Sequence, residues 1–183
     1  MSIPRITPVS PPYQPEIASE FEKMMPPGIA PLKLFRTIAK NPRILRKFRQ
    51  SNLLDRGAIE RRDREIVILR TCARCGAEYE WGVHVAFFAA RFGISGQQVA
   101  ATVNSTAQAS CWSEKDGILI RLVDELHDMA HISDELWKAL SDNWLPAQLI
   151  EFLTLTGAYH MVSFVINGIG VELEEGAPTF PQV

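Results

Sequence analysis

The sequence predicts a single all-α domain, and three observations support this prediction. No stretch alternates apolar and polar residues cleanly between hairpin turns, which is the pattern of half-buried strands. Prolines and glycines instead separate segments with helical periodicity, and serines precede several of these segments as N-caps would. With 183 residues, 46% hydrophobic and 22% charged, the chain can form one globular domain around a sizeable core.

The N-terminal part is expected to be an extended arm followed by short helices. Residues 1–15 contain five prolines, which lack a backbone N–H, so this segment cannot form a regular helix or strand. It should run extended over a surface or a neighbouring subunit. Helical segments follow at residues 15–25, 31–41 and 43–54, each closed by proline or glycine. Two strongly apolar helices come next, at 58–74 and 78–92, separated by Gly76 and ended by Gly93.

The C-terminal part is expected to be a series of capped helices. Ser95, Ser113 and Ser133 should begin helices over 96–104, 114–130 and 134–143. The last helix, starting near Pro146, is apolar nearly all round and uncharged after Glu151, which predicts a core or interface helix. Residues 16–176 should therefore form a single all-α domain, and 177–183 an irregular tail.

Composition limits the function classes. A formal net charge of -2 gives no broad attraction to nucleic acid or anionic lipid. The proline-rich start lacks the apolar region of a signal peptide, and no uncharged apolar run of about 18 residues is evident, so a cytoplasmic location is expected. Three cysteines do not form a disulfide framework.

One pair of residues can move protons. Glu80 and His84 stand four residues apart in an expected helix, so they share a face and lie within hydrogen-bonding reach. An imidazole titrates near neutral pH, and a neighbouring carboxylate fixes its tautomer and raises its pKa, as a general acid or base requires. Glu65 lies on a largely apolar helix face. The structural alternative is that Arg61 or Arg64 holds Glu65, while Glu80 and His84 form a solvated surface pair.

The run from Arg62 to Ser95, RDREIVILRTCARCGAEYEWGVHVAFFAARFGIS, resembles the carboxymuconolactone decarboxylase family and its alkylhydroperoxidase D-like relatives. The resemblance rests on the spacing of Glu65, Tyr79, Glu80 and His84 and extends over about residues 40–176. It implies an all-α fold of paired helices, assembled as dimers, trimers or hexamers. The two thiols of the peroxidase relatives would fall on Ala77 and Glu80, so the acid-base branch is favoured.

The acid-base branch implies specific roles. Decarboxylation of a lactone-type acid leaves an enolate that must be protonated on carbon, which requires a cation, an oxyanion donor and a positioned acid. His84, oriented by Glu80, is the expected acid and Tyr79 the expected oxyanion donor. The remaining candidates are Arg64 and Arg70 for the substrate carboxylate, with Trp81, Tyr159 and Asn167 lining the pocket or merely packing the core. No cofactor is expected, because the sequence contains neither a G-x-G-x-x-G motif nor a P-loop.

Other readings stay open. Cys72 and Cys75 form a genuine C-x-x-C motif, displaced from the family position, which can support a thiol-dependent peroxidase or can simply pack in the core. A third alternative is a non-catalytic, oligomeric binding protein on the same scaffold. His127 and His131 have a spacing that can bind zinc, but no third ligand is evident, so a solvated helix end and no metal are expected.

Overall fold

The computed structural model describes residues 4–51 and 53–182, and every regular element in these ranges is helical. The predicted all-α class is therefore confirmed. The α-helices are α1 (Pro15–Met24), α2 (Lys33–Ile38), α3 (Pro42–Ser51), α4 (Arg61–Arg74), α5 (Glu78–His84), α6 (Gly96–Asn104), α7 (Glu114–Met129), α8 (Asp134–Asn143) and α9 (Pro146–Ile169).

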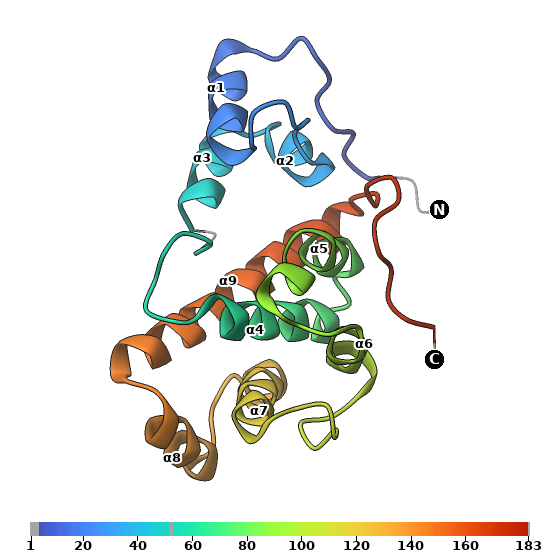
Figure 1. The fold of residues 1–183 in the computed structure, drawn as a ribbon. Helices are drawn as coiled ribbons and strands as arrows, with labels where there is room; N and C mark the ends of the chain where they lie inside the picture. The colour runs from blue at the N-terminus through green and yellow to red at the C-terminus, as the bar shows by residue number, and fades with distance from the viewer. Residues whose placement is uncertain (1–3, 52, 183) are drawn as a thin grey trace.

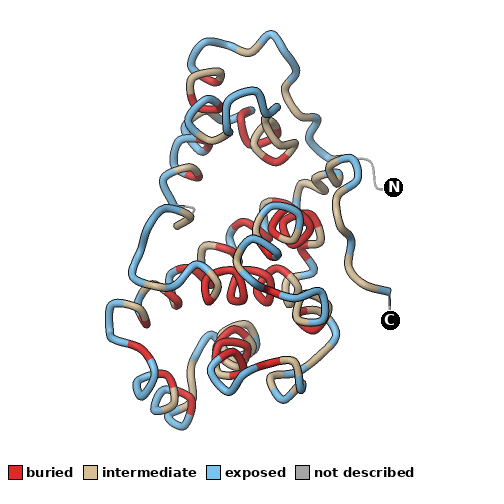
Figure 2. The backbone as a smooth tube through the Cα atoms, viewed as in Figure 1, coloured by how far each residue is buried: buried red, intermediate tan, exposed pale blue. Residues whose placement is uncertain are grey.

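Helix α4 forms the centre of the molecule. Helices α1 to α3 gather at one end and α7 and α8 at the other, with α4, α5 and α9 crossing between them (Figure 1). α4 packs against α5, α6, α7 and α9, and all residues from Asp63 to Cys72 are buried. Figure 2 shows this helix as a continuous buried segment. Because α4 is surrounded on every side, any polar side chain on it must find a partner inside the protein.

The predicted N-caps are present. The hydroxyl groups of Ser95, Ser113 and Ser133 accept hydrogen bonds from the backbone N–H groups of Gln98, Asp116 and Leu136, respectively. Each bond satisfies one of the free N–H groups at the start of a helix, which explains why α6, α7 and α8 begin where the sequence predicts.

The helix expected over residues 78–92 changes its winding. It is regular only through His84, then becomes a π-helix over Val85–Ala89 and a 3-10 helix over Ala90–Phe92. Gly93 ends it with a positive φ of 75°. π-Helical turns are rare and occur often at functional sites. In this chain the π-helix begins immediately after His84.

Helix α9 is long and apolar enough to cross a membrane by length and composition alone, so the sequence-based statement that no such run is evident was wrong. Core helices of soluble proteins pass the same test. Here Phe152, Leu155 and Tyr159 are almost completely buried, while Ile150 and Phe164 on another face are exposed. The helix thus contributes one face to the core and presents an apolar face outward, in agreement with its prediction as a core or interface helix.

The two terminal segments lie against the helical body. In the arm, the backbone N–H of Arg5 donates to Ile169 O at 2.9 Å, and that of Val9 to Arg36 O at 3.1 Å. In the C-terminal segment, the N–H of Phe180 donates to the Glu78 carboxylate at 2.7 Å, and its ring packs edge-on against Trp81 at 5.3 Å. The C-terminal segment is therefore fixed on α5.

Gly82 allows the C-terminal segment to lie close to α5, because a Cβ at this position would overlap the backbone oxygen of Pro178. We expect Gly82→Ala to displace the C-terminal segment and to lower the free energy of unfolding by about 1–3 kcal/mol, as overpacking usually does. Chemical denaturation measures the loss of stability. Limited proteolysis after residue 176 reports whether the C-terminal segment has left α5. Gly96→Ala is the matched control, since its Cβ would meet nothing. Equal stability of both variants would contradict the close-contact explanation.

Candidate active site

A buried ion pair joins α4 to α5. His84 Nδ1 lies 2.6 Å from Glu65 Oε2, and the two residues are 2% and 0% exposed. A short bond between a carboxylate and an imidazole N–H is the strong, charge-assisted kind. Glu65 thus has the partner that a carboxylate on an apolar helix face needs, and it fixes the orientation of the imidazole ring.

The opposite edge of the imidazole faces two more polar groups. His84 Nε2 lies 3.1 Å from the hydroxyl of Tyr159 on α9 and 3.5 Å from Glu80 Oε1. The half-buried ring of Phe88, in the π-helix, lies 5.1 Å from the imidazole. The four polar groups of Glu65, Glu80, His84 and Tyr159 therefore form one cluster, which we call the His84 cluster.

The His84 cluster favours a protonated imidazole. Burial by itself lowers the pKa of His84, but the charge of Glu65 and the hydrogen bonds to Glu65 and Glu80 outweigh it and raise the pKa to about 9. At neutral pH, Nδ1–H then donates to Glu65 and Nε2–H points toward Tyr159 and Glu80. Burial raises the pKa of Tyr159 well above its usual value, so its hydroxyl keeps its proton.

The carboxylate that binds His84 most closely is Glu65 rather than Glu80. Glu80 was expected to orient His84, but Glu65 makes the short bond to Nδ1, and Glu80 lies on the Nε2 side. Arg64 Nε approaches Glu65 at 3.4 Å, while its Nη1 donates to the backbone oxygens of Leu54 and Asp55. Arg64 therefore pairs with Glu65, as expected if Glu65 is held by a neighbouring arginine. Its guanidinium is occupied by protein groups.

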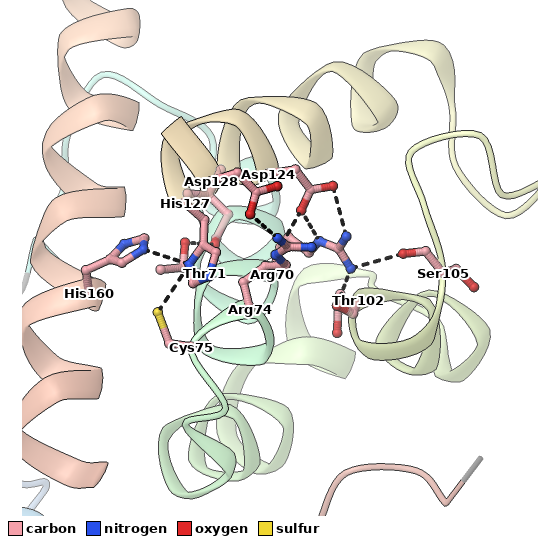
Figure 3. Close-up of polar contacts among 11 residues, drawn as sticks. Arg70, Thr71, Arg74, Cys75, Thr102, Ser105, Asp124, His127, Asp128 and His160 are labelled. Carbon is pink, nitrogen blue, oxygen red and sulfur yellow. Dashed lines mark hydrogen bonds and ion pairs between the residues drawn. The ribbon is translucent and has the colours of Figure 1, made fainter. Parts of the chain in front are cut away.

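Arg70 does not belong to the site. Its Nε and Nη2 donate to both oxygens of Asp124 at 2.7 and 2.9 Å, and its Nη1 to the backbone oxygens of Thr102 and Ser105 (Figure 3). The side chain is buried and bound at three nitrogens. The prediction that Arg70 binds a substrate carboxylate is wrong, because the guanidinium joins α4 to α6 and α7 instead.

Three other predicted residues also lie outside the His84 cluster. Tyr79 donates its hydroxyl to Glu174 at 2.6 Å and accepts from Leu34 N–H at 3.1 Å. Trp81 donates to the hydroxyl of Thr102 at 3.0 Å in the core. Asn167 donates to Cys75 O at 2.8 Å and lines, with Tyr79, a hollow of about 670 Å³ that His84 does not reach. The tyrosine hydroxyl that lies beside His84 belongs to Tyr159 rather than to Tyr79.

The role of Tyr79 can be tested separately. Tyr79→Phe removes the hydroxyl that joins Glu174 to Leu34, so we expect the free energy of unfolding to fall by about 1–3 kcal/mol, because the buried N–H of Leu34 loses its partner. Chemical denaturation at neutral pH measures it. A variant as stable as the parent would show that this hydroxyl does not fix the segment around residue 174.

The two motif cysteines have different surroundings. Cys72 is completely buried in α4, and burial raises the pKa of its thiol well above its usual value. Cys75 follows the end of α4 and is half-buried, with its sulfur 3.8 Å from His127 Nδ1. A thiol must ionise to attack a peroxide. The environment of Cys72 therefore disfavours the thiol-dependent alternative, whereas that of Cys75 leaves its sulfur accessible.

Comparison with known proteins finds similarity both to one sequence family and to solved structures with the alkylhydroperoxidase D-like fold. Residues 40–118 match the carboxymuconolactone decarboxylase family. The match includes Glu65, Tyr79, Glu80 and His84, and it agrees with the resemblance found in the sequence over these residues. No curated protein sequence matches significantly.

Solved structures extend the likeness over more of the chain. A peroxidase-related protein with an alkylhydroperoxidase AhpD core from Ralstonia eutropha has 12% identity and a TM-score of 0.72, covering 96% of this chain and 94% of its own. The debrominase Bmp8 in complex with 2,3,4-tribromopyrrole has 16% identity and a TM-score of 0.69, covering 92% and 91%. A protein of unknown function from Agrobacterium tumefaciens, suggested to be the antioxidant defence protein AhpD, has 16% identity and a TM-score of 0.65, covering 75% and 94%. At these identities the likeness shows the fold alone.

Proposed function

We propose that the protein is a cofactor-free acid-base enzyme that acts on a small organic acid or lactone, with His84 as the proton donor. The observation that supports this proposal is the buried Glu65–His84 pair, in which Glu65 binds Nδ1 and the Nε2 edge faces Tyr159 and Glu80. A charged imidazole fixed on one side and presented on the other is the arrangement that general acid catalysis requires.

The proposed step is protonation of an enolate. Loss of carbon dioxide from a lactone-type acid leaves an electron pair delocalised onto oxygen. His84 Nε2 delivers its proton to the carbon and becomes neutral, while Glu65 keeps Nδ1–H in place. Tyr159, which retains its own proton, donates a hydrogen bond to the developing oxyanion. We assign the relay of the replacement proton to Glu80, because its carboxylate lies 3.5 Å from Nε2 and its side chain is 12% exposed.

Tyr159→Phe tests the proposed oxyanion donor. We expect kcat to fall by about 10²–10³-fold, the usual cost of one oxyanion-hole donor, with little change in KM. Steady-state kinetics on any lactone acid that the parent decarboxylates gives both constants. Unchanged kcat in a folded variant would remove Tyr159 from the reaction, because its contact with His84 would then be only structural.

The thiol-dependent peroxidase is the competing proposal, and Cys72→Ala separates it from the acid-base reaction. Reduced parent and variant are assayed for carbon dioxide release from a panel of lactone acids and for reduction of an alkyl hydroperoxide by dithiothreitol. The acid-base proposal expects carbon dioxide release of similar rate in both proteins. Peroxide reduction that disappears with Cys72→Ala, without carbon dioxide release from any acid, would support the peroxidase instead. Saturable binding without turnover in either assay would favour a binding protein.

We also propose a cytoplasmic homo-oligomer without nucleic-acid or membrane partners. Support comes from the exposed apolar side chains on one face of α9, where Ile150 is 65% and Phe164 is 70% exposed, since monomers rarely expose such residues together. Light scattering coupled to size exclusion measures the mass, and a monomer at micromolar concentration would contradict the proposal.

A further inference from the structure

Three metal-binding side chains from distant parts of the sequence meet outside the His84 cluster. Cys75 follows α4, His127 lies in the last turn of α7, and His160 lies in α9. His127 Nδ1 is 3.8 Å from Cys75 Sγ and 3.1 Å from His160 Nε2, and the three ligand atoms all lie within 4.8 Å of one another (Figure 3). His131, whose spacing from His127 the sequence also offers, lies beyond the end of α7 and outside this group.

We propose that Cys75, His127 and His160 form a binding site for one zinc ion. Zinc prefers thiolate and imidazole ligands in tetrahedral geometry, and its usual bond lengths place two nitrogen ligands about 3.3 Å apart and a sulfur and a nitrogen about 3.5 Å apart. The observed separations of 3.1 and 3.8 Å are close to both values. The third pair, Cys75 Sγ and His160 Nε2, lies within 4.8 Å, so side-chain rotation of Cys75 or His160 is the movement that would close the site around the ion.

The hydrogen bonds around the three ligands prepare them for a cation. His160 Nδ1–H donates to the backbone oxygen of Thr156 at 2.9 Å, which leaves the lone pair of Nε2 directed at His127 and Cys75. Metal-bound histidines commonly donate the N–H of the second ring nitrogen to a carbonyl or carboxylate oxygen, which fixes the ring orientation. Asn167 donates to Cys75 O at 2.8 Å and so fixes the backbone that carries the thiol.

The nearby charges are balanced. Arg74, which would otherwise oppose a cation, pairs with Asp124 and Asp128 on α7. Asp124 also pairs with Arg70, so two carboxylates balance two guanidinium groups beside the site.

The site is separate from the His84 cluster, although α9 serves both. Neighbouring residues on a helix point about 100° apart, so Tyr159 faces His84 while His160 faces His127. Three protein ligands leave the fourth position of a tetrahedral zinc open, as in catalytic rather than closed structural sites. All three ligands are half-buried, so an exogenous ligand such as water can reach that position.

Metal titration tests the proposal. Protein reduced and freed of metal by a chelator is titrated with Zn²⁺ against a chromophoric chelator, and separately with Co²⁺, whose spectrum reports thiolate ligation and tetrahedral geometry. We expect one ion per chain and a thiolate-to-cobalt band. Cys75→Ser and His160→Ala should each weaken zinc binding by at least about 100-fold, beyond the cost of losing an outer-shell partner. Cys75→Ser should also abolish the cobalt thiolate band.

Matched controls are available in the same chain. Cys111→Ser removes a free cysteine, and His131→Ala removes an exposed histidine, both outside the proposed site. We expect both variants to bind zinc as the parent does. The proposal is overturned if the reduced parent binds no zinc, if binding survives both Cys75→Ser and His160→Ala, or if the controls weaken it equally. Circular dichroism confirms that each variant is folded.

Discussion

Replacing His84 by glutamine is expected to lower kcat by about 10²–10⁴-fold, the usual contribution of a general acid. Glutamine keeps much of the side-chain volume, and its amide can still donate to Glu65, but it has no proton to give to a carbanion. The loss should therefore appear in kcat, with KM little changed. Steady-state kinetics on a lactone acid that the parent decarboxylates measures it.

A matched histidine variant controls for general effects of the substitution. His131→Gln changes an exposed histidine far from the His84 cluster in the sequence and should leave the kinetics unchanged. Circular dichroism and thermal unfolding establish that His84→Gln is folded. A folded His84→Gln enzyme with parental turnover would exclude His84 as the acid, and the assignment of the whole cluster would have to be abandoned.

Glu65→Gln should have the largest effect on stability. It removes the charge that outweighs burial at His84, so the pKa of His84 should fall toward or below 6.5, and the imidazole should be neutral at pH 7. Breaking a buried ion pair lowers the free energy of unfolding by about 3–5 kcal/mol, because one charge is left buried without a partner. We expect a loss near the lower value, because His84 can release its proton and become neutral. Urea denaturation at neutral pH measures it.

Glu80→Gln is the matched control for Glu65→Gln. Glu80 approaches the same imidazole at 3.5 Å, rather than 2.6 Å, and its side chain is 12% exposed, whereas that of Glu65 is completely buried. We expect a smaller loss of stability and a smaller decrease in the pKa of His84. Equal effects of the two substitutions would contradict the conclusion that Glu65 is the dominant partner.

The same pair predicts how stability depends on pH. The folded-state pKa of His84, about 9, is above the unfolded value of about 6.5, so the protonated imidazole stabilises the folded state. This contribution is fully present below pH 6.5 and is lost as the pH rises through 9. The parent should therefore become less stable over this range, whereas Glu65→Gln should show a flatter profile. Denaturation curves across this range test the sign.

Much of the fold follows from local sequence signals. Serine caps and proline breaks placed α1 and α6 to α9 within a few residues, because these signals act on the neighbouring backbone. The π-helix after His84 was not predicted. Apolar periodicity is almost the same for an α-helix and for one with a single wide turn, and the change of winding depends on how α5 packs against α4.

The site was only partly predictable for the same reason. The spacing of Glu80 and His84 correctly placed them on one helix face, but the shorter bond to Glu65 depends on the crossing of α4 and α5. Tyr79 and Tyr159 are both buried tyrosines, and only the tertiary structure directs one to Glu174 and the other to His84. Likewise, no local pattern indicates that His160 lies beside His127, which is 33 positions earlier.

The protonation state of His84 tests the central claim most directly, and it can be measured before any substrate is known. NMR of ¹⁵N-histidine-labelled protein, with His84→Gln to assign the signal, follows both ring nitrogens across the pH range. We predict a doubly protonated ring at pH 7 that titrates with a pKa of about 9, and a neutral ring at pH 7 in Glu65→Gln. A neutral His84 at pH 7 in the parent protein would contradict its assignment as a charged acid held by Glu65.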